Sequence, residues 1–353
     1  RPAADAAADA AEAAALRALD EDAYALEAAH DYARASLLDD AIGVLAARLP
    51  QPEAKADPMV AYTLGWLHER KGDAAQAATW YRRGRELPPD YCFPFRVEEI
   101  AVLERAMAHD PRDPRAPYYL GNLLYDLQPE RAIAEWGKSR ALDPGFARVH
   151  RNLAFAYARA RGALAQAAAS QEKAVAIEKR EPRLYYELDQ YLAWTKAPLS
   201  TRLARLTESP GTVASREITA GRLGRVQVLL GKDDDAVDTL SGTRFHVWEG
   251  ESGIHSVYVA ARLERGRGLL ARGDAAAALE EFRATVDVPV NVEVGQGAGA
   301  HLAATHHHVG LALEKLGRRD EAAVAFRESA SVPAVVAEGH YWIGRSLQRL
   351  GRP

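Results

Sequence analysis

The sequence predicts an all-α fold in which antiparallel helix pairs repeat along the chain. Small residues recur at one place in the first helix of each pair, and an alanine followed four residues later by a large side chain recurs in the second. Glycines and prolines separate these segments at matching places. Gly310 and Gly344 are 34 residues apart, which is the period of a helix-pair repeat.

Each recurring position has a packing reason. The glycine of the first helix and the alanine of the second lack bulk, so the two backbones approach closely and an aromatic side chain fills the remaining space. In the pair Gly72-Asp73, glycine ends the first helix in left-handed geometry and aspartate caps the second. Pro89 and Pro144 follow second helices because proline does not continue a helix interior.

The copies of the repeat can be followed along most of the chain. They predict about eight helix pairs wound into a right-handed superhelix. Residues 1–15 are predicted to be an Ala-rich linker or helix extension, 16–210 an N-terminal half, and 211–353 a C-terminal half that ends in a capping helix. In chain order the copies are marked by Tyr32/Ala41/Leu45, Gly65/Ala77/Tyr81, Gly121/Ala132/Trp136, Leu153/Tyr157/Ala174, Gly224/Ala236/Leu240, Gly266/Ala278/Phe282 and Gly310/Ala322/Phe326.

The repeat is interrupted by insertions. From Gly65 to Gly121 the interval is 56 residues, and the surplus holds an aromatic loop and an amphipathic segment that predict an extra helix near 95–109. Insertions in such arrays map to loops, which often lie on the binding face. The alternative is that they adjust curvature or cover an exposed groove. Further departures from the repeat fall at 182–210, 243–253 and 287–301.

Composition excludes several classes of protein. The 353 residues include 45 basic and 49 acidic side chains, so neither nucleic acid nor a membrane is expected as a partner. The single cysteine, Cys92, rules out an internal disulfide framework. No apolar run approaches the roughly 20 residues that span a bilayer, and no signal segment is visible, so we expect a cytoplasmic protein. Because the chain begins at Arg1 in an Ala/Asp-rich stretch, we expect that an upstream region has been removed.

The recurring pattern resembles that of the tetratricopeptide repeat family. The interruptions extend this resemblance, because "PDYCFPFRVEEIAVLERAM", "DPRAPYYLGNLLYD", "RLYYELDQYL" and "RFHVWEGESG" resemble the C-terminal tetratricopeptide region of large bacterial proteins. Those proteins carry an upstream mutarotase-like β-sandwich domain of uncharacterised function. The resemblance runs from about residue 16 to the end, and it implies carbohydrate handling through that upstream domain.

The concave face of such an array is lined by the first helix of each pair, at positions that share one helical face. These positions combine aromatic side chains with arginines and an asparagine, which suits an extended peptide, a sugar or a neighbouring domain. The alternative is that the aromatic side chains pack between repeats. The candidate groove residues are Tyr62, Trp66, Glu69, Tyr118, Asn122, Tyr125, Arg148, Arg151 and Phe155, with Met59 and Arg115 on the same face.

One tetratricopeptide subclass clamps the C-terminal carboxylate of a partner with a lysine and two asparagines. Asn122 and Asn152 fall at the asparagine positions of that clamp. Arg148 takes the position of one of the basic residues of the clamp. Tyr118 occupies the lysine position, however, which argues against this clamp.

The stretch Thr243–Gly253 supplies a loop candidate. Phe245 and Trp248 are predicted to plug a seam between repeats, which leaves His246 and Glu249 without a packing role. His246, Trp248 and Glu249 are therefore the loop residues that we select for a functional role.

Three consecutive histidines invite a metal hypothesis. Consecutive helical residues diverge by about 100°, so His306, His307 and His308 cannot all bind one ion, and we predict no metal site. His306 and His340 stand one period apart at a position that is normally aromatic. They are predicted to pack inward between repeats.

The sequence carries no phosphate-binding glycine loop, no nucleophile elbow and no zinc-binding His-Glu-x-x-His, and we expect no cofactor. We therefore predict a non-catalytic scaffold that packs against an upstream carbohydrate-type domain. Two alternatives remain open. One is a free-standing adaptor that binds a partner peptide in the concave groove, and the other is a segment that contributes loop residues to a shared carbohydrate-active site.

Overall fold

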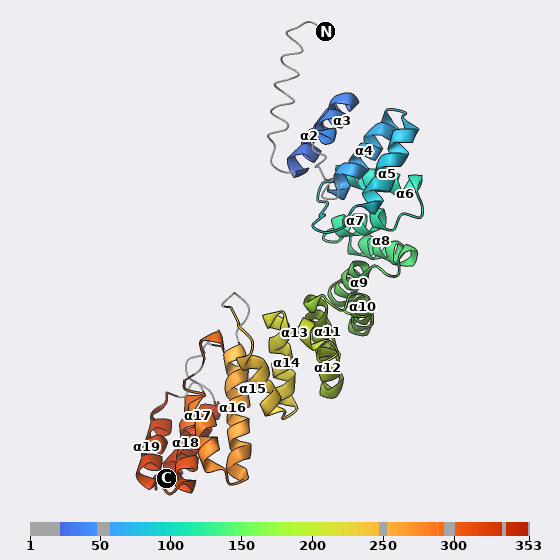
Figure 1. Ribbon diagram of the computed structural model, residues 1–353. Coiled ribbons are helices and arrows are strands. Elements are labelled where there is room, and N and C mark those ends of the chain that lie inside the picture. Colours follow the sequence, from blue (N-terminus) through green and yellow to red (C-terminus); the bar gives the residue numbers. More distant parts are fainter. Residues whose placement is uncertain are drawn as a thin grey trace, which may run out of the picture. The chain divides into compact units, whose positions relative to one another are not determined.

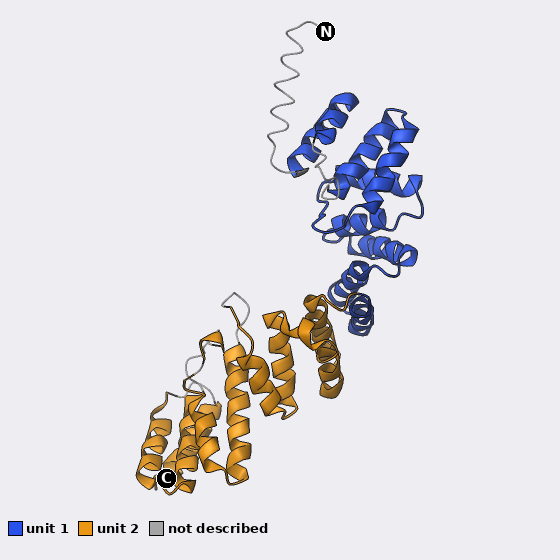
Figure 2. Cartoon of the chain, viewed as in Figure 1, with its two compact units in different colours: residues 1–177 blue, residues 178–353 orange. Residues whose placement is uncertain are grey.

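The computed structural model describes residues 22–47, 57–246, 253–287, 289–292, 301–333 and 337–351. These residues form nineteen α-helices and one short 3-10 helix, and none of them lies in a β-strand (Figure 1). The predicted all-α repeat fold is thereby confirmed. The chain divides into two compact units, Arg1–Ile177 and Glu178–Pro353 (Figure 2). None of the described helices combines the length and the apolar character that crossing a bilayer requires.

The first unit is built from successive helix pairs with one additional helix. The pairs are α2 with α3, α4 with α5, α7 with α8, and α9 with α10. The predicted extra helix is present as α6, which packs against both α4 and α7. The helices are α2 Asp22–Arg34, α3 Leu38–Ala46, α4 Pro58–Arg70, α5 Ala74–Glu86, α6 Glu98–His109, α7 Arg115–Leu124, α8 Pro129–Leu142, α9 Ala147–Arg159 and α10 Leu164–Ile177.

The second unit continues the same architecture. Its pairs are α11 with α12, α14 with α15, α16 with α17, and α18 with α19, and α20 packs on both α18 and α19. Its elements are α11 Pro182–Trp194, α12 Leu199–Leu206, α13 Pro210–Ala214, α14 Glu217–Leu229, α15 Asp233–Ser241, α16 Ile254–Ala271, α17 Ala275–Arg283, η2 Val290–Val292, α18 Leu302–Lys315, α19 Arg319–Ser331 and α20 Ala337–Arg349.

The glycines of the first helices lie directly under aromatic rings of the second helices. A Cβ atom at Gly121 would lie 2.5 Å from the indole of Trp136, and one at Gly266 would lie 2.4 Å from the ring of Phe282. Real Cβ atoms do not come this close to a ring, so only glycine permits the observed distance between the helices. The same contact joins Gly65 to Tyr81 and Gly310 to Phe326.

The turns within the pairs follow from the Gly-Asp signature. Gly72 has a φ of +84°, a left-handed conformation in which a side chain would be strained. The carboxylate of Asp73 then accepts a hydrogen bond from the backbone N–H of Gln76 at 3.1 Å and caps the N-terminus of α5. Asp274 caps α17 in the same way, through the N–H of Ala277.

Candidate partner-binding site

Two consecutive first helices of the first unit, α7 and α9, bring several predicted groove residues into contact. The amide Nδ2 of Asn152 on α9 donates a hydrogen bond to Oδ1 of Asn122 on α7 at 2.8 Å. The same oxygen accepts a second hydrogen bond, of 3.1 Å, from the indole Nε1 of Trp136 on α8. The repeat signature thus places Trp136 where it also orients a polar residue, and three helices fix Asn122.

An aromatic cluster adjoins the two asparagines. The ring of Tyr125 stacks on Trp136 with centroids 5.4 Å apart, and it lies 5.5 Å from the ring of Phe155 on α9. Phe155 is 40% exposed, and the guanidinium of Arg159 lies 5.4 Å from its centroid. This part of the surface therefore offers an apolar ring with a cation beside it, which is a common combination at protein interfaces.

Tyr118 contributes little surface of its own. Its ring packs edge-on against Tyr119 and Phe146, and only 7% of the residue is exposed. Burial raises the pKa of the Tyr118 phenol, while a hydrogen bond with Asn122 acts in the opposite direction. Tyr118 therefore contributes a hydrogen bond to Asn122 and little exposed surface. We call the surface formed by Tyr118, Asn122, Tyr125, Arg148, Arg151, Asn152 and Phe155 the α7–α9 face.

The charges on these two helices are of one sign. Together α7 and α9 carry four arginines and no aspartate or glutamate. Arg115 lies 3.8 Å from the ring centroid of Phe146 and 3.3 Å from a carboxylate oxygen of Asp143, and Arg148 forms an ion pair with Asp90 in the loop before α6. Arg159 has no ion-pair partner among the described residues. At the end of α9, Arg159 therefore favours an anionic ligand over a cationic one.

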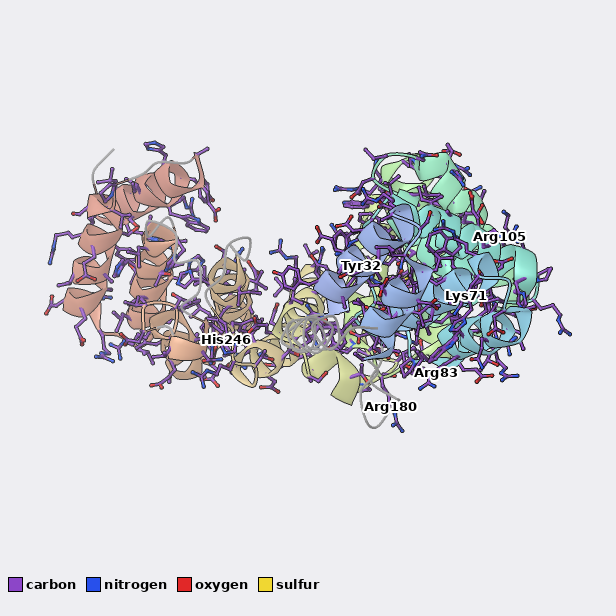
Figure 3. All side chains as sticks on the ribbon, turned by 90° about the horizontal axis from the view of Figure 1, so that it is seen from above. Tyr32, Lys71, Arg83, Arg105, Arg180 and His246 are labelled. Carbon is purple, nitrogen blue, oxygen red and sulfur yellow. The ribbon has the colours of Figure 1, made fainter. Side chains whose placement is uncertain are left out.

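The candidate residues on α4 do not continue this face. Tyr62 is completely buried, and its hydroxyl donates a 2.7 Å hydrogen bond to Oδ2 of Asp113, so it does not line a groove. Trp66 packs against His30 of α2, with ring centroids 5.9 Å apart. Glu69 accepts a hydrogen bond from Tyr81 and pairs with Arg105 of α6, which is labelled in Figure 3.

The position of α6 explains this separation. The sequence predicts the extra helix, but a continuous groove from Tyr62 to Phe155 requires α4 and α7 to pack as neighbouring first helices. Instead α6 packs against both of them, and its Arg105 forms an ion pair with the carboxylate of Glu69. Complete burial excludes Tyr62 from a groove, and the candidates that the structure brings together are those on α7 and α9.

The loop candidate is described only in part. His246 is exposed, its Nδ1 lies 2.6 Å from Oε2 of Glu217 at the start of α14, and its backbone N–H donates to the same oxygen (Figure 3). Phe245 is buried among apolar side chains that include Leu240 and Tyr258, as its predicted plug role requires. Trp248 and Glu249 lie outside the described residues.

Sequence reasoning missed the residue that holds this loop. The side-chain amide of Asn291 in η2 donates to the backbone carbonyls of Leu240, Ser241 and Thr243, at 3.1, 3.2 and 2.7 Å. The backbone carbonyl of Asn291 accepts a hydrogen bond of 3.1 Å from the backbone N–H of Phe245. The insertion that contains Asn291 therefore closes the end of α15. No local sequence signal reveals such a contact between two insertions.

The histidine prediction was off by one residue. His307 and His308 are the buried pair, whereas His306 is only partly buried and His340 is exposed. Burial lowers the pKa of His307 to about 4 and also lowers the pKa of His308. His307 Nδ1 lies 2.8 Å from the hydroxyl of Ser346 on α20. An error of one position rotates the assigned face of a helix by about 100°, so the inward side chains were misidentified.

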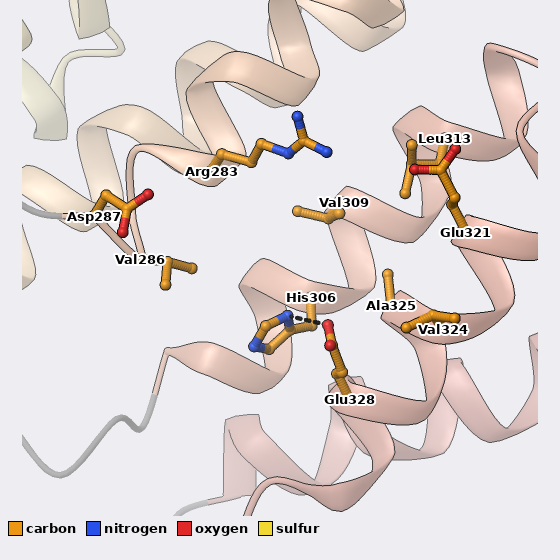
Figure 4. Close-up of a pocket in the computed structure, with 10 residues that line it drawn as sticks. All are labelled: Arg283, Val286, Asp287, His306, Val309, Leu313, Glu321, Val324, Ala325 and Glu328. Carbon is orange, nitrogen blue, oxygen red and sulfur yellow. Dashed lines mark ion pairs between the residues drawn. The ribbon is translucent and has the colours of Figure 1, made fainter.

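A pocket of about 390 Å³ opens in the second unit between the end of α17, α18 and α19 (Figure 4). At one end, Nδ1 of His306 lies 3.2 Å from Oε2 of Glu328, and Arg283 extends from α17 on the other side. Val309 and Leu313 give the pocket an apolar wall. In the part of the chain that the structure describes, no three His, Cys, Asp or Glu side chains are grouped so as to hold a metal ion.

No family model matches the chain. Among solved structures, the chain is similar to YrrB, described as a TPR protein with an unusual peptide-binding site, at 15% identity over 70% of this chain and 97% of that one, with a TM-score of 0.35. It is similar to Naa15/Naa10 bound to HypK-THB at 14% identity, over 83% of this chain and 39% of that one, with a TM-score of 0.49. For PilF of Pseudomonas aeruginosa the identity is 18%, the coverages are 67% and 100%, and the TM-score is 0.37.

Proposed function

We propose that this protein is a non-catalytic scaffold that binds an extended segment of a partner protein on the α7–α9 face. The observation that carries the proposal is the contact between Asn122 and Asn152 on consecutive first helices, beside the exposed ring of Phe155. Asparagine side chains at this spacing suit hydrogen bonding to the backbone of an extended peptide. Phe155 then supplies the apolar contact.

The polar groups of the face support this role. Oδ1 of Asn122 already accepts two hydrogen bonds, which fix the orientation of its side chain. Within the described part of the chain, Oδ1 of Asn152 has no hydrogen-bond partner, so it is available to accept a peptide N–H. Arg159 of α9, beside Phe155, adds attraction for a carboxylate.

The test is a binding measurement with peptides selected from a displayed random library on the wild-type protein. We expect the double variant Phe155→Ala/Asn152→Ala to weaken the binding of a selected peptide by about tenfold or more, because it removes the ring and the free acceptor. Tyr341→Ala removes an exposed aromatic side chain from α20 and serves as the control. Equal affinity of the wild type and the double variant would contradict the proposal.

The sequence resemblance supports a second candidate, in which the chain packs against an upstream carbohydrate-type domain and lends it loop residues. The exposed His246, oriented by Glu217, favours the loop as the point of contact. In a full-length protein that carries such a domain, His246→Ala is expected to lower turnover of a carbohydrate substrate while the fold is retained. Unchanged turnover would exclude a shared site that uses His246.

A further inference from the structure

An unusual apolar surface precedes α6. From residue 91, which has a φ of +59°, to residue 97 at the start of α6, the side chains alternate between exposed and buried positions. Cys92 and Pro94 point inward. On the opposite side lie four large apolar side chains, which we call the 91–97 strip: Tyr91, Phe93, Phe95 and Val97, exposed by 91, 73, 65 and 72%. Single exposed apolar residues are ordinary, but four in succession on one side mark an interaction surface.

The strip is fixed to the helices behind it. The buried carboxylate of Glu99 accepts hydrogen bonds of 2.8 Å from the backbone N–H groups of both Phe95 and Arg96. The guanidinium of Arg96 lies 4.0 Å from the ring centroid of Phe95 and donates to the carbonyl of Ala23 on α2 at 2.6 Å. Because the exposed side chains stand on an ordered backbone, a ligand that covers them loses little free energy to ordering the strip.

The strip borders the α7–α9 face. Asp90 immediately precedes it and forms an ion pair with Arg148 at the start of α9. On its inner side, Cys92 belongs to the same apolar core as Tyr118 of α7. A ligand that leaves the strip at Asp90 therefore reaches Arg148 and then a helix that carries arginines and no acidic residue.

We propose that the 91–97 strip is a docking surface for an extended acidic segment of a partner protein. Apolar side chains at alternate positions of an extended segment lie on one side of it, and that side packs on the exposed side chains of the strip, which stand at every second residue. Acidic side chains further along reach Arg159 of α9, which has no ion-pair partner among the described residues, so charge complementarity selects the segment. This inference rests on the proposed function of the α7–α9 face, which it extends by one subsite and by the chemistry of the ligand.

The experiment uses the whole chain and peptides selected from a displayed random library on the wild type. We expect the selected peptides to be rich in Asp and Glu, with Phe, Leu or Ile at alternate positions. Fluorescence anisotropy of one labelled peptide then gives its Kd for the wild type and for Phe93→Ser/Phe95→Ser. The Kd should rise about tenfold or more in this variant. Leu127→Ser, which changes a side chain that is 90% exposed in the turn after α7, should leave the Kd unchanged.

A variant of the α7–α9 face separates the two proposals. Phe155→Ala/Arg159→Ala leaves the ion pair of Arg148 and Asp90 intact, so it tests the face without disturbing the strip. If this variant loses affinity and the strip variant does not, the docking strip is overturned and the proposed function stands. If only the strip variant loses affinity, the proposed function fails. The inference fails with it, because the ligand then does not extend from the strip to α9.

Other results would also overturn the inference. These are the selection of basic peptides, the absence of any enrichment, or a wild-type dimer in light scattering that the strip variant converts to a monomer, which would assign the strip to a second copy. Circular dichroism and thermal unfolding must match the wild type in each variant. Should Phe93→Ser/Phe95→Ser fail to fold, Tyr91→Ser/Val97→Ser tests the same surface through its other two side chains.

Discussion

At Gly121 the indole of Trp136 occupies the volume that any other residue would need for its side chain. The absence of a Cβ atom therefore sets the distance between α7 and α8, and through Trp136 it also sets the position of Asn122. One position in the repeat thus serves both packing and the candidate site. The same arrangement at Gly266 and Gly310 serves packing only.

We expect Gly121→Ala to lower the free energy of unfolding by about 1 to 3 kcal/mol, because the new methyl group would force the indole and the two helices apart. The measurement is urea denaturation followed by circular dichroism. Gly137→Ala is the matched control in α8. Nothing lies within 4 Å of a Cβ atom at Gly137, so alanine should stabilise the helix by up to about 1 kcal/mol. Two changes of the same sign would argue against close packing as the reason for Gly121.

At the scale of elements, α11 and α12 form a pair without the glycine and alanine signature. Their contact is made instead by Asp189 and Arg202, joined by two parallel hydrogen bonds of 2.7 and 2.8 Å. Both residues are buried, and Arg222 of α14 approaches the same carboxylate to 3.7 Å. An ion pair thus takes the place of close backbone packing.

We expect Asp189→Ala to destabilise the protein by about 3 to 5 kcal/mol, because it leaves the guanidinium of Arg202 buried without its counterion. Replacing both partners, with Asp189→Leu/Arg202→Met, should recover most of this loss. On the same helix, Arg183→Ala removes a largely exposed side chain that pairs with Glu187 and should cost at most about 0.5 kcal/mol. Chemical denaturation of the wild type and the three variants checks this order of stabilities. A double variant as unstable as Asp189→Ala would contradict it.

The elements also show how far sequence reasoning reaches. The helix pairs, their Gly-Asp turns and the extra helix α6 follow from local patterns that the structure confirms. The packing of α6 between α4 and α7 does not, because amphipathicity tells which face is buried and not which helix covers it. The role of Asn291 could not be predicted for a similar reason, since it depends on a contact between two insertions that are distant in the sequence. Sequence reasoning located the two asparagines of the α7–α9 face, and only the structure gave their mutual hydrogen bond.

At the scale of the whole molecule, each unit contains a buried histidine that the fold keeps neutral. Burial lowers the pKa of His30 in the first unit and of His307 in the second to about 4. The charges of His308, Arg345 and Arg349 also oppose protonation of His307. As the pH falls below 6.5 the unfolded chain binds protons that the folded chain does not, so stability is lost between about pH 6.5 and 4.

This loss should be larger in the second unit. Each histidine lowers the free energy of unfolding by about 2 to 3 kcal/mol as the pH falls through this range. In the first unit, burial raises the pKa of Glu99 and Asp113, and such groups favour the folded state as the pH falls, which offsets part of the effect of His30. Hydrogen exchange at pH 7 and 5, corrected for intrinsic rates, should show a greater loss of protection in α18 and α20 than in α4. His307→Gln should reduce the response of α20, part of which remains because His308 is also buried, and a response as large as that of the wild type would refute the assignment.

The buried face of the 91–97 strip has a practical consequence. Cys92 is the single cysteine of the chain, burial raises the pKa of its thiol, and its Sγ donates to Asp57 at 3.4 Å. A thiol in this state reacts slowly with alkylating reagents until the backbone around it opens. The rate of alkylation therefore reports how often the strip detaches, without any engineered label. A partner peptide seated on the strip should slow that rate, which gives an independent kinetic assay for occupancy.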